Sequence, residues 1–260
     1  LTPALTNLGG PVRLDPATAP DQVFRLVESM GARIAEAPDP VILPKAAKNP
    51  AEVAGMRAAH LRDGAAVTEL LCWLDRRAPR LEDEPLTEIG VARKLEELRM
   101  ARGILDISFD TISATGPHGA ICHYRVSADS DLRILPGQVL LVDSGGQYPD
   151  GTTDITRTLP MGDPDPAVRR PYTRVLQGMI ALSRAQFPRG VAGCHLDALA
   201  RAPLWMEGLD YDHGTGHGVG AGLSVHEGPV RISRVSDIPL EPGMILSNEP
   251  GYYREGAFGI

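Results

Sequence analysis

The sequence lacks the features that several classes of protein require. Within its 260 residues, no apolar stretch approaches the ~20 residues that a membrane helix needs, so we expect a protein that does not span a membrane. The only cysteines are Cys72, Cys122 and Cys194, and their wide spacing predicts neither a disulfide framework nor a thiolate metal site. This usage favours a reducing compartment, and hence a cytoplasmic location.

Basic residues are also fewer than acidic residues. Lysine and arginine number 26 against 33 aspartates and glutamates, which gives a net charge of -7. An acidic protein of this kind is a poor general binder of nucleic acid or anionic lipid. By contrast, the apolar share of 43% and the charged share of 23% are typical of a globular protein.

We expect the chain to be an internal part of a longer protein. It begins with Leu1 rather than methionine, and it ends at Ile260 within an apolar run that resembles a strand. Pro38, Pro40 and Pro44 interrupt the chain before a strong helix start. We therefore expect residues 1–45 to be the end of a preceding α/β domain with its linker, and residues 46–260 to form the main domain.

Periodicity and capping residues predict an α+β fold. Asn49, Pro50 and Glu52 together form a helix start with a capping box. Helices are predicted at residues 22–30, 50–77, 87–100, 166–187 and 195–206. Strands are predicted at residues 12–14, 40–43, 107–112, 121–124, 139–143, 155–159, 223–226, 244–248 and 257–260. Two helices followed by strands thus occur twice, which indicates two similar halves.

Two carboxylates follow neighbouring predicted strands. Asp143 closes the apolar run at residues 139–142, and Asp154 precedes a second strand after a turn at residues 148–151. Taken alone, Asp143 is best interpreted as a turn cap. If the two strands are adjacent, however, both carboxylates can reach one face, where they repel each other unless a cation lies between them.

A histidine and a glutamate complete a candidate ligand set. His217 lies in a glycine-rich segment, 213–220, that cannot form a stable helix, and Glu249 follows an apolar run before Pro250. Each alone has a simpler interpretation as a packed or strand-end residue. Together with Asp143 and Asp154 they offer three oxygen ligands and one imidazole, which favours Mn²⁺, Mg²⁺ or a similar ion.

The same glycine-rich segment also fits a loose dinucleotide-binding pattern, at residues 216–221. That pattern requires a preceding strand and a following helix. Residues 223–229 instead have the character of a strand and a turn, so a dinucleotide site is not expected.

Several segments resemble the Xaa-Pro aminopeptidases (aminopeptidase P), within the creatinase, prolidase and methionine aminopeptidase superfamily. The similar segments are residues 115–124, 142–158, 213–220, 225–229 and 248–253. The likeness extends over about residues 45–260, and the motif sequences are similar to those of the larger, three-domain type.

This resemblance implies the pita-bread fold, in which two pseudo-symmetric α+β halves surround a dinuclear site, here preceded by the end of a creatinase N-terminal-like domain. It implies two divalent ions, usually Mn²⁺, with Asp143, Asp154, His217 and Glu249 as ligands. One more bridging glutamate is expected beyond Ile260, so we expect this C-terminally incomplete chain to bind metal weakly or to be inactive. The family also implies a homodimer.

The resemblance further implies hydrolysis of the N-terminal Xaa-Pro bond in peptides with proline at the second position. Glu249 would carry the proton from water to the leaving nitrogen. His123 and His226 would flank the substrate as catalytic and binding residues, and His213 would line the proline pocket. Arg157 is a candidate partner for a ligand carboxylate. Tyr252 and Tyr253 either wall the pocket or pack.

Two other functions are compatible with these residues. The first is a prolidase, which would cleave only Xaa-Pro dipeptides. The second is a non-catalytic peptide- or protein-binding module that keeps the fold without its metals. The presence of all four ligand candidates argues against this module, and the expected fifth ligand keeps it open.

Overall fold

A computed structural model describes residues 10–260 of the protein. The chain divides into two compact units, one that ends at Lys45 and one that spans Ala46–Ile260. In the first unit, β1 (Val12–Leu14) pairs in parallel with β2 (Ile34–Glu36), and α2 (Asp21–Ser29) connects them. The predicted strand at residues 12–14 and the helix at 22–30 are confirmed, whereas β2 was not predicted.

The predicted strand at residues 40–43 is wrong. A short helix, α3 (Ile42–Ala46), occupies that segment and crosses the boundary between the units. Pro44 falls in its first turn, where the missing N–H of proline removes no helical hydrogen bond. An apolar run of only four residues does not distinguish a strand from a helical turn.

The second unit opens with the long helix α4 (Pro50–Arg77), whose bounds agree with the prediction. The Asn49 side chain accepts hydrogen bonds from the backbone N–H groups of Ala51 (2.9 Å) and Glu52 (3.0 Å). The Glu52 carboxylate in turn accepts from the Asn49 N–H at 2.9 Å. This reciprocal cap satisfies donors that a helix start otherwise leaves unpaired.

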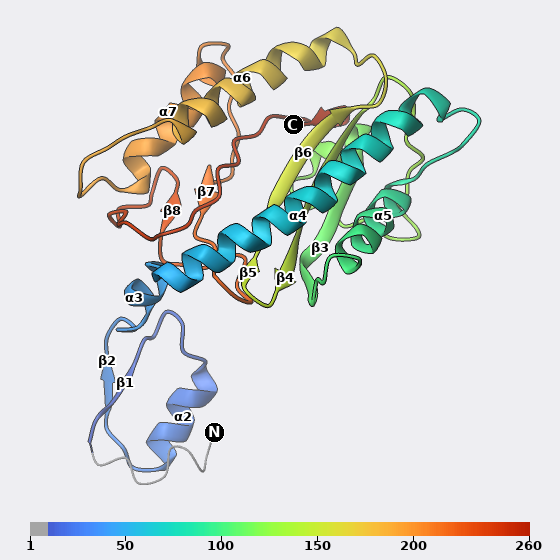
Figure 1. Ribbon diagram of the computed structural model, residues 1–260. Coiled ribbons are helices and arrows are strands. Elements are labelled where there is room, and N and C mark those ends of the chain that lie inside the picture. The colour runs from blue at the N-terminus through green and yellow to red at the C-terminus, as the bar shows by residue number, and fades with distance from the viewer. Residues whose placement is uncertain (1–9) are drawn as a thin grey trace. The chain divides into compact units, whose positions relative to one another are not determined.

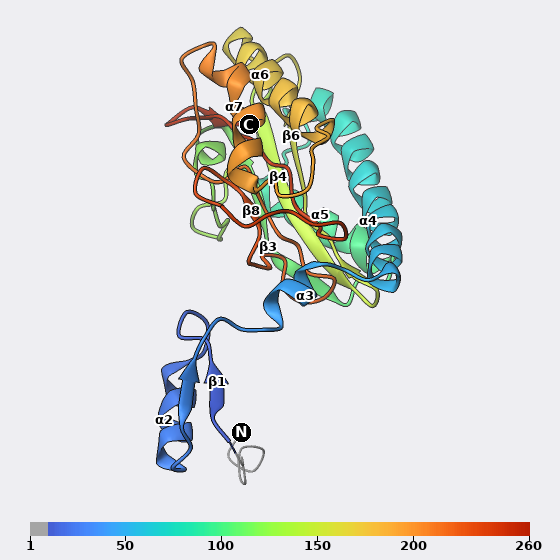
Figure 2. The same cartoon turned by 90° about the vertical axis from the view of Figure 1, so that its left-hand side faces the viewer.

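A four-stranded antiparallel sheet follows α4, the 3₁₀ turn η1 (Ala78–Arg80) and α5 (Glu88–Met100). Its strands are β3 (Asp106–Thr115), β4 (Val139–Tyr148), β5 (Gly151–Thr152) and β6 (Ile155–Pro160). The central strand β4 pairs with all three others. Figures 1 and 2 show α4 and α5 packed on one face of this sheet.

Side-chain alternation along β4 separates the core from the site. Leu140 and Val142 join the apolar cluster formed with α4 and α5. Leu141 belongs to a different cluster, with residues of β3. Because successive side chains point to opposite faces of a sheet, Asp143 shares the face of Leu141, away from the two helices.

The second half of this unit repeats the order of helices and strands. The helices α6 (Pro166–Ser183) and α7 (Gly193–Trp205) lie side by side (Figures 1 and 2). Short strands follow: β7 (Gly216–His217), β8 (Arg231–Ile232), β9 (Tyr253–Arg254) and β10 (Phe258–Gly259). This order confirms the predicted α+β class, although the strands of this half are much shorter than those of the first. Across residues 10–260, no helix combines the length and apolar character needed to cross a membrane.

Three further strand predictions fail or hold only in part. Residues 121–124 form a turn after the 3₁₀ segment η2 (Gly116–Ala120), and residues 223–226 are bends. At Leu223 the backbone has a φ of 65°, and its N–H donates to the Gln147 side chain rather than to a strand. Residues 244–248 make only isolated bridges, Ala47 with Met244 and Gly218 with Leu246.

Candidate metal centre

One cavity of about 1280 Å³ collects the predicted site residues. Its lining includes every one of them: His123, Asp143, Asp154, His213, His217, His226 and Glu249. They come from both halves of the second unit and from segments more than a hundred residues apart in the sequence. The structure therefore brings the whole candidate set together in one place.

The two aspartates reach the cavity from neighbouring strands. Asp143 pairs with Thr156 in the β4–β6 ladder, and Asp154 directly precedes β6. The Thr156 hydroxyl donates to Asp143 Oδ1 at 2.7 Å. Burial, and next the negative charge of Asp154, raise the pKa of Asp143 to about 7. The carboxylates are thus close enough to repel, as the strand pairing predicts.

The backbone of the glycine-rich segment sets the direction of the His217 ring. Its Nδ1 donates to the Gly218 carbonyl (2.9 Å), which leaves Nε2 facing the carboxylates. Nε2 lies 3.2 Å from Asp154 Oδ2 and 3.2 Å from Glu249 Oε1. Burial opposes protonation, but the hydrogen bonds to Asp154 and Gly218 raise the pKa of His217 above its usual value.

Two glycines next to His217 permit close main-chain contacts. A Cβ at Gly216 would lie 2.1 Å from the Ser247 carbonyl oxygen, and one at Gly218 would lie 2.1 Å from that of Glu227. Only glycine allows this approach without displacing the main chain.

Ser247 connects the histidine to the glutamate. Its hydroxyl accepts from the His217 backbone N–H at 2.9 Å and donates to Glu249 Oε1 at 2.6 Å. Burial is the main reason that the pKa of Glu249 is raised. Sequence reasoning missed Ser247, although its position two residues before Glu249 in an extended segment places both side chains on one face.

The chemistry of these side chains fits a divalent cation. Asp143, Asp154 and Glu249 supply hard oxygen atoms, and the His217 ring is already oriented by a hydrogen bond from its other nitrogen. A cation among the carboxylates would relieve the repulsion that raises the Asp143 pKa. Within residues 10–260, no three His, Cys, Asp or Glu side chains already form a closed ligand cluster. His217 Nε2 instead bridges Asp154 and Glu249.

The other histidines occupy different parts of the same cavity. The ring of His226 meets that of His217 edge-on, with centroids 4.3 Å apart, and burial followed by the charge of His217 lowers the His226 pKa. The exposed side chain of His123 also lines the cavity. His213 donates from Nδ1 to the Gly214 carbonyl (2.8 Å), so its Nε2 accepts from the Tyr253 hydroxyl at 2.8 Å.

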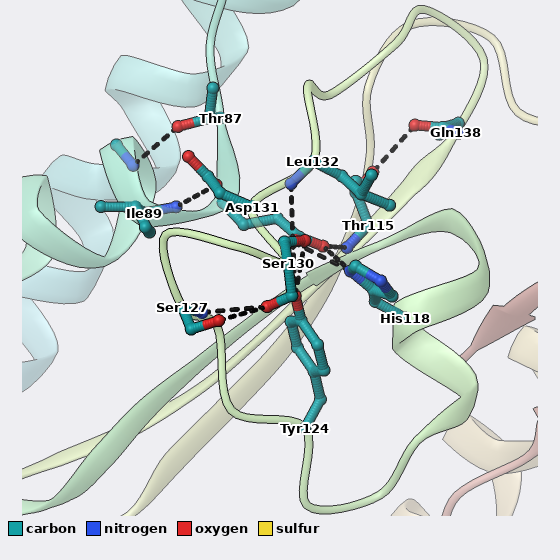
Figure 3. A network of polar contacts seen from close by, with 12 residues as sticks. Thr87, Ile89, Thr115, His118, Tyr124, Ser127, Ser130, Asp131, Leu132 and Gln138 are labelled. Atoms are coloured by element: carbon teal, nitrogen blue, oxygen red, sulfur yellow. Dashed lines mark hydrogen bonds and ion pairs between the residues drawn. The ribbon is translucent and has the colours of Figure 1, made fainter.

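The buried carboxylate of Glu88 supports the segment that carries His123. Glu88 is fully buried at the start of α5. Its hydrogen-bond donors, at 2.7 to 3.1 Å, are Thr115 N, His118 Nδ1, Tyr124 OH and Leu132 N. Figure 3 shows these four residues converging on one point. The anchored Tyr124 directly follows His123, so the network restrains the backbone of that histidine.

A buried pair on α7 supports the glycine-rich segment. Arg201 Nε donates to Asp197 Oδ2 (2.6 Å), and both side chains are nearly inaccessible to solvent. Arg201 also donates to the carbonyls of Tyr211 (2.6 Å) and His213 (2.7 Å). The Thr215 hydroxyl donates to Asp197 Oδ1 at 2.6 Å. Sequence reasoning missed this pair, although an aspartate and an arginine four residues apart in a predicted helix is a readable signal.

Arg157 and the two tyrosines take distinct positions. Arg157 lines the cavity and donates to the Thr156 carbonyl at 2.7 Å. Among the described residues, it makes no ion pair with a carboxylate of the candidate ligand set. Both tyrosines pack against the apolar cluster that contains Phe258, and Tyr253 also lines the cavity.

The sequence of this chain is similar to those of known metallopeptidases. Residues 54–260 match the family model described as Metallopeptidase family M24. The chain is 53% identical over 226 residues to a "Probable Xaa-Pro aminopeptidase P" of Tuber melanosporum, covering 85% of this chain and 36% of that protein. A protein of the same name from Metarhizium robertsii is 51% identical, covering 87% and 37%. The chain thus spans about a third of the length of these curated relatives.

Solved structures agree with these matches. An X-prolyl aminopeptidase from Caenorhabditis elegans, described as a cytosolic enzyme with a di-nuclear active site, has a TM-score of 0.85 at 41% identity, covering 96% of this chain and 40% of that one. A prolidase from Pyrococcus furiosus has a TM-score of 0.85 at 27% identity, covering 100% and 73%. These similarities confirm the predicted pita-bread fold.

Proposed function

The chain belongs to metallopeptidase family M24, and from that premise we propose that it is the catalytic part of an Xaa-Pro aminopeptidase with two divalent ions. One observation carries the proposal: Asp143, Asp154, His217 and Glu249 converge on one cavity. Relatives named Xaa-Pro aminopeptidase P, about half identical in sequence, support the choice of reaction.

Under this proposal, Asp143, Asp154, His217 and Glu249 hold the ions. Mn²⁺ is our choice of metal, because the set combines three carboxylates with one imidazole and contains no thiolate. When bound, such ions supply a nucleophilic hydroxide near neutral pH and polarise the scissile carbonyl.

The remaining side chains handle protons and position the substrate. Glu249 is proposed to accept a proton from water and to pass it to the leaving nitrogen. The lowered pKa of His226 keeps its ring neutral near pH 7, so the ring can donate to a developing oxyanion. His123 lines the same cavity from the other half of the unit, and His213 with Tyr253 forms a wall for the proline ring.

The same comparison supports the choice of substrate class. A peptide with proline second presents a tertiary amide that lacks an N–H and has a fixed ring geometry. We also propose that residues 1–45 end a preceding α/β domain and its linker, and that residues 46–260 form the catalytic domain. We further propose a homodimer, which the family resemblance implies, and a cytoplasmic location, in keeping with the cytosolic relative from C. elegans.

A peptide-length assay on the full-length protein tests the proposal. Metal-free protein is loaded with Mn²⁺ and given a tripeptide with proline second, the same peptide with alanine second, and an Xaa-Pro dipeptide. We expect chelator-sensitive release of the first residue from the proline tripeptide and little cleavage of the alanine peptide. Cleavage of the dipeptide alone would indicate a prolidase. No cleavage and no bound metal would indicate the binding module.

A matched pair of histidine variants links the activity to the proposed ligands. His217→Ala is expected to abolish cleavage. His60→Ala changes a histidine that lines the same cavity from α4 and hydrogen-bonds to the Met56 carbonyl. It is expected to retain activity within a few-fold. Equal activity of the two variants would contradict the proposed ligand set.

A further inference from the structure

A second group of charges lies between the sheet and the helices that cover it, and does not line the cavity. Arg99 on α5 and Asp63 on α4 are both fully buried. Arg99 Nε donates to Asp63 Oδ1 at 2.6 Å, and Nη2 donates to Asp63 Oδ2 at 3.0 Å. This two-point contact uses the planar fork of arginine, which a lysine does not have.

The pair also contacts the residues that flank the two aspartates of the candidate metal centre. Arg99 Nη2 donates to the hydroxyl of Ser144 at 3.1 Å, and Ser144 directly follows Asp143. The hydroxyl of Thr153 donates to Asp63 Oδ2, and Thr153 directly precedes Asp154. One buried pair therefore connects the two chain segments that present these carboxylates.

Close packing holds α4 against the turn between these segments. A Cβ at Gly55 would lie 2.2 Å from the Asp150 carbonyl oxygen, and one at Gly151 would lie 3.0 Å from Met56 Cα. The Tyr148 hydroxyl adds a hydrogen bond to Asp63 Oδ1 at 3.2 Å. The helix that carries Asp63 thus has little freedom to move relative to β4 and β5.

A buried ion pair is weak support for stability by itself, because well-packed apolar residues often replace such pairs without loss. Its use here lies in geometry, since two carboxylates that repel each other must be kept close. We infer that Asp63 and Arg99 are positioning residues, which fix the spacing of Asp143 and Asp154 through Ser144 and Thr153. This inference rests on the proposed metal site.

Two double variants, made in the full-length protein, test the inference. Ser144→Ala with Thr153→Val removes both side-chain links and leaves the ion pair and the hydrogen bond from Arg99 Nη1 to the Gly145 carbonyl (3.4 Å) intact. It also removes the hydrogen bond from the Gly146 N–H to the Thr153 hydroxyl (2.9 Å). Thr111→Val with Ser113→Ala is the matched control, because these hydroxyls are also buried, lie on the adjacent strand β3 and have no hydrogen-bond partner. Arg99→Lys adds a direct test, since it keeps the charge but loses the fork.

The primary measurement is Mn²⁺ affinity by calorimetry on metal-free protein. Residues that orient metal ligands typically change affinity by about 10–100-fold when they are substituted. We expect a loss in that range for the link variant and for Arg99→Lys, and less than about 3-fold for the control, whose hydroxyls orient no ligand. The electron paramagnetic resonance spectrum of bound Mn²⁺ is sensitive to the spacing of coupled ions. We expect this spectrum to change in the link variant and in Arg99→Lys, and to stay the same in the control.

Thermal unfolding of the metal-free proteins shows whether each variant is folded, so that a loss of Mn²⁺ affinity in a folded variant is assigned to positioning. Wild-type affinity in both the link variant and Arg99→Lys would overturn the inference while leaving the proposed function intact. If Arg99→Lys does not fold, the link variant alone decides. Absence of Mn²⁺ binding by the wild-type protein would overturn the proposed function and the inference with it.

Discussion

Each half of the second unit contains one buried aspartate–arginine pair, and the two pairs are built differently. In the first half, Asp63 and Arg99 come from separate helices, 36 residues apart in the sequence. In the second half, Asp197 and Arg201 lie one turn apart on the same helix. The first pair holds side-chain hydroxyls beside two strands, whereas the second mainly holds main-chain carbonyls of an irregular segment.

The difference reflects what each half already provides. Strands β4 and β6 pair in an unbroken ladder beside Asp143 and Asp154, so the first pair only needs to adjust the spacing between segments. The second half has two-residue strands and isolated bridges around His217 and Glu249. There, glycine contacts and the Arg201 hydrogen bonds replace the ladder. A continuous sheet and a network of single contacts can therefore present ligands to the same cavity.

The largest expected effect would show that both halves are indispensable. Asp154→Asn removes a proposed ligand of the first half, and His217→Ala removes one of the second. Each is expected to lower kcat/KM on a proline tripeptide by more than about 100-fold, the upper range for residues that only orient a ligand. Steady-state kinetics with saturating Mn²⁺ checks this. Retention of a tenth of the activity in either variant would show that its half is dispensable.

Breaking either buried pair compares the two halves directly. Arg201→Met and Arg99→Met each leave a buried aspartate without its partner, and each is expected to lower the free energy of unfolding by about 3–5 kcal/mol. Arg234→Met, in an exposed pair with Asp210, serves as the control and is expected to lose less than about 1 kcal/mol. Urea unfolding of the metal-free proteins measures all three. A loss confined to Arg99→Met would show that the single-helix pair is not needed for the fold.

The glycine contacts are expected to matter at specific positions only. Gly216→Ala forces a side chain against the Ser247 carbonyl and is expected to destabilise the fold by about 1–3 kcal/mol. Gly222→Ala, in the same glycine-rich region, meets no atom within 4 Å and is the matched control. Unfolding curves and tripeptide kinetics check both variants. Equal stability of the two would show that the second half tolerates displacement around His217.

The smallest effect concerns acid stability in the second half. Burial raises the pKa of Asp210, but hydrogen bonds from Trp205 and Arg201 outweigh burial and lower this pKa from 3.8 to about 2. A depressed carboxylate pKa stabilises the fold above pH 3.8, and this contribution is lost as the pH falls toward 2.

Because a third of its side chain is exposed, Asp210 is expected to contribute about 1 kcal/mol at neutral pH, less than the full shift would give. The unfolding free energies of the wild type and Asp210→Asn should therefore differ at pH 7 and converge near pH 2. A constant difference would assign the effect to packing rather than to charge.

Local signals predicted most of the first half. The cap at Asn49 depends on residues within one turn, and so the start of α4 was predictable to the residue. The adjacency of β4 and β6 follows from a short turn between two apolar runs, and it places Asp143 and Asp154 at the same cavity. The roles of the histidines came instead from resemblance to a family, because no local pattern distinguishes a ligand from a packed side chain.

Contacts between distant residues account for most of what could not be predicted. The Asp63–Arg99 pair joins two helices directly, and neither residue has a neighbour in the sequence that reveals the other. The expected strand at residues 223–226 is replaced by bends where the Gln147 side chain, 76 residues away, accepts the Leu223 N–H and donates to its carbonyl. Tertiary hydrogen bonds of this kind override an apolar run of four residues.

The main-chain contacts at Gly216 and Gly218 also limit how this segment can change over generations. The atoms that oppose them are carbonyl oxygens of Ser247 and Glu227, and every amino acid carries a carbonyl oxygen. A clash with a side chain can be relieved by a smaller residue elsewhere, but substitutions at residues 227 and 247 leave these carbonyl oxygens in place. Saturation mutagenesis should therefore favour glycine at both positions, and substitutions at residues 227 and 247 should not restore the stability of the alanine variants.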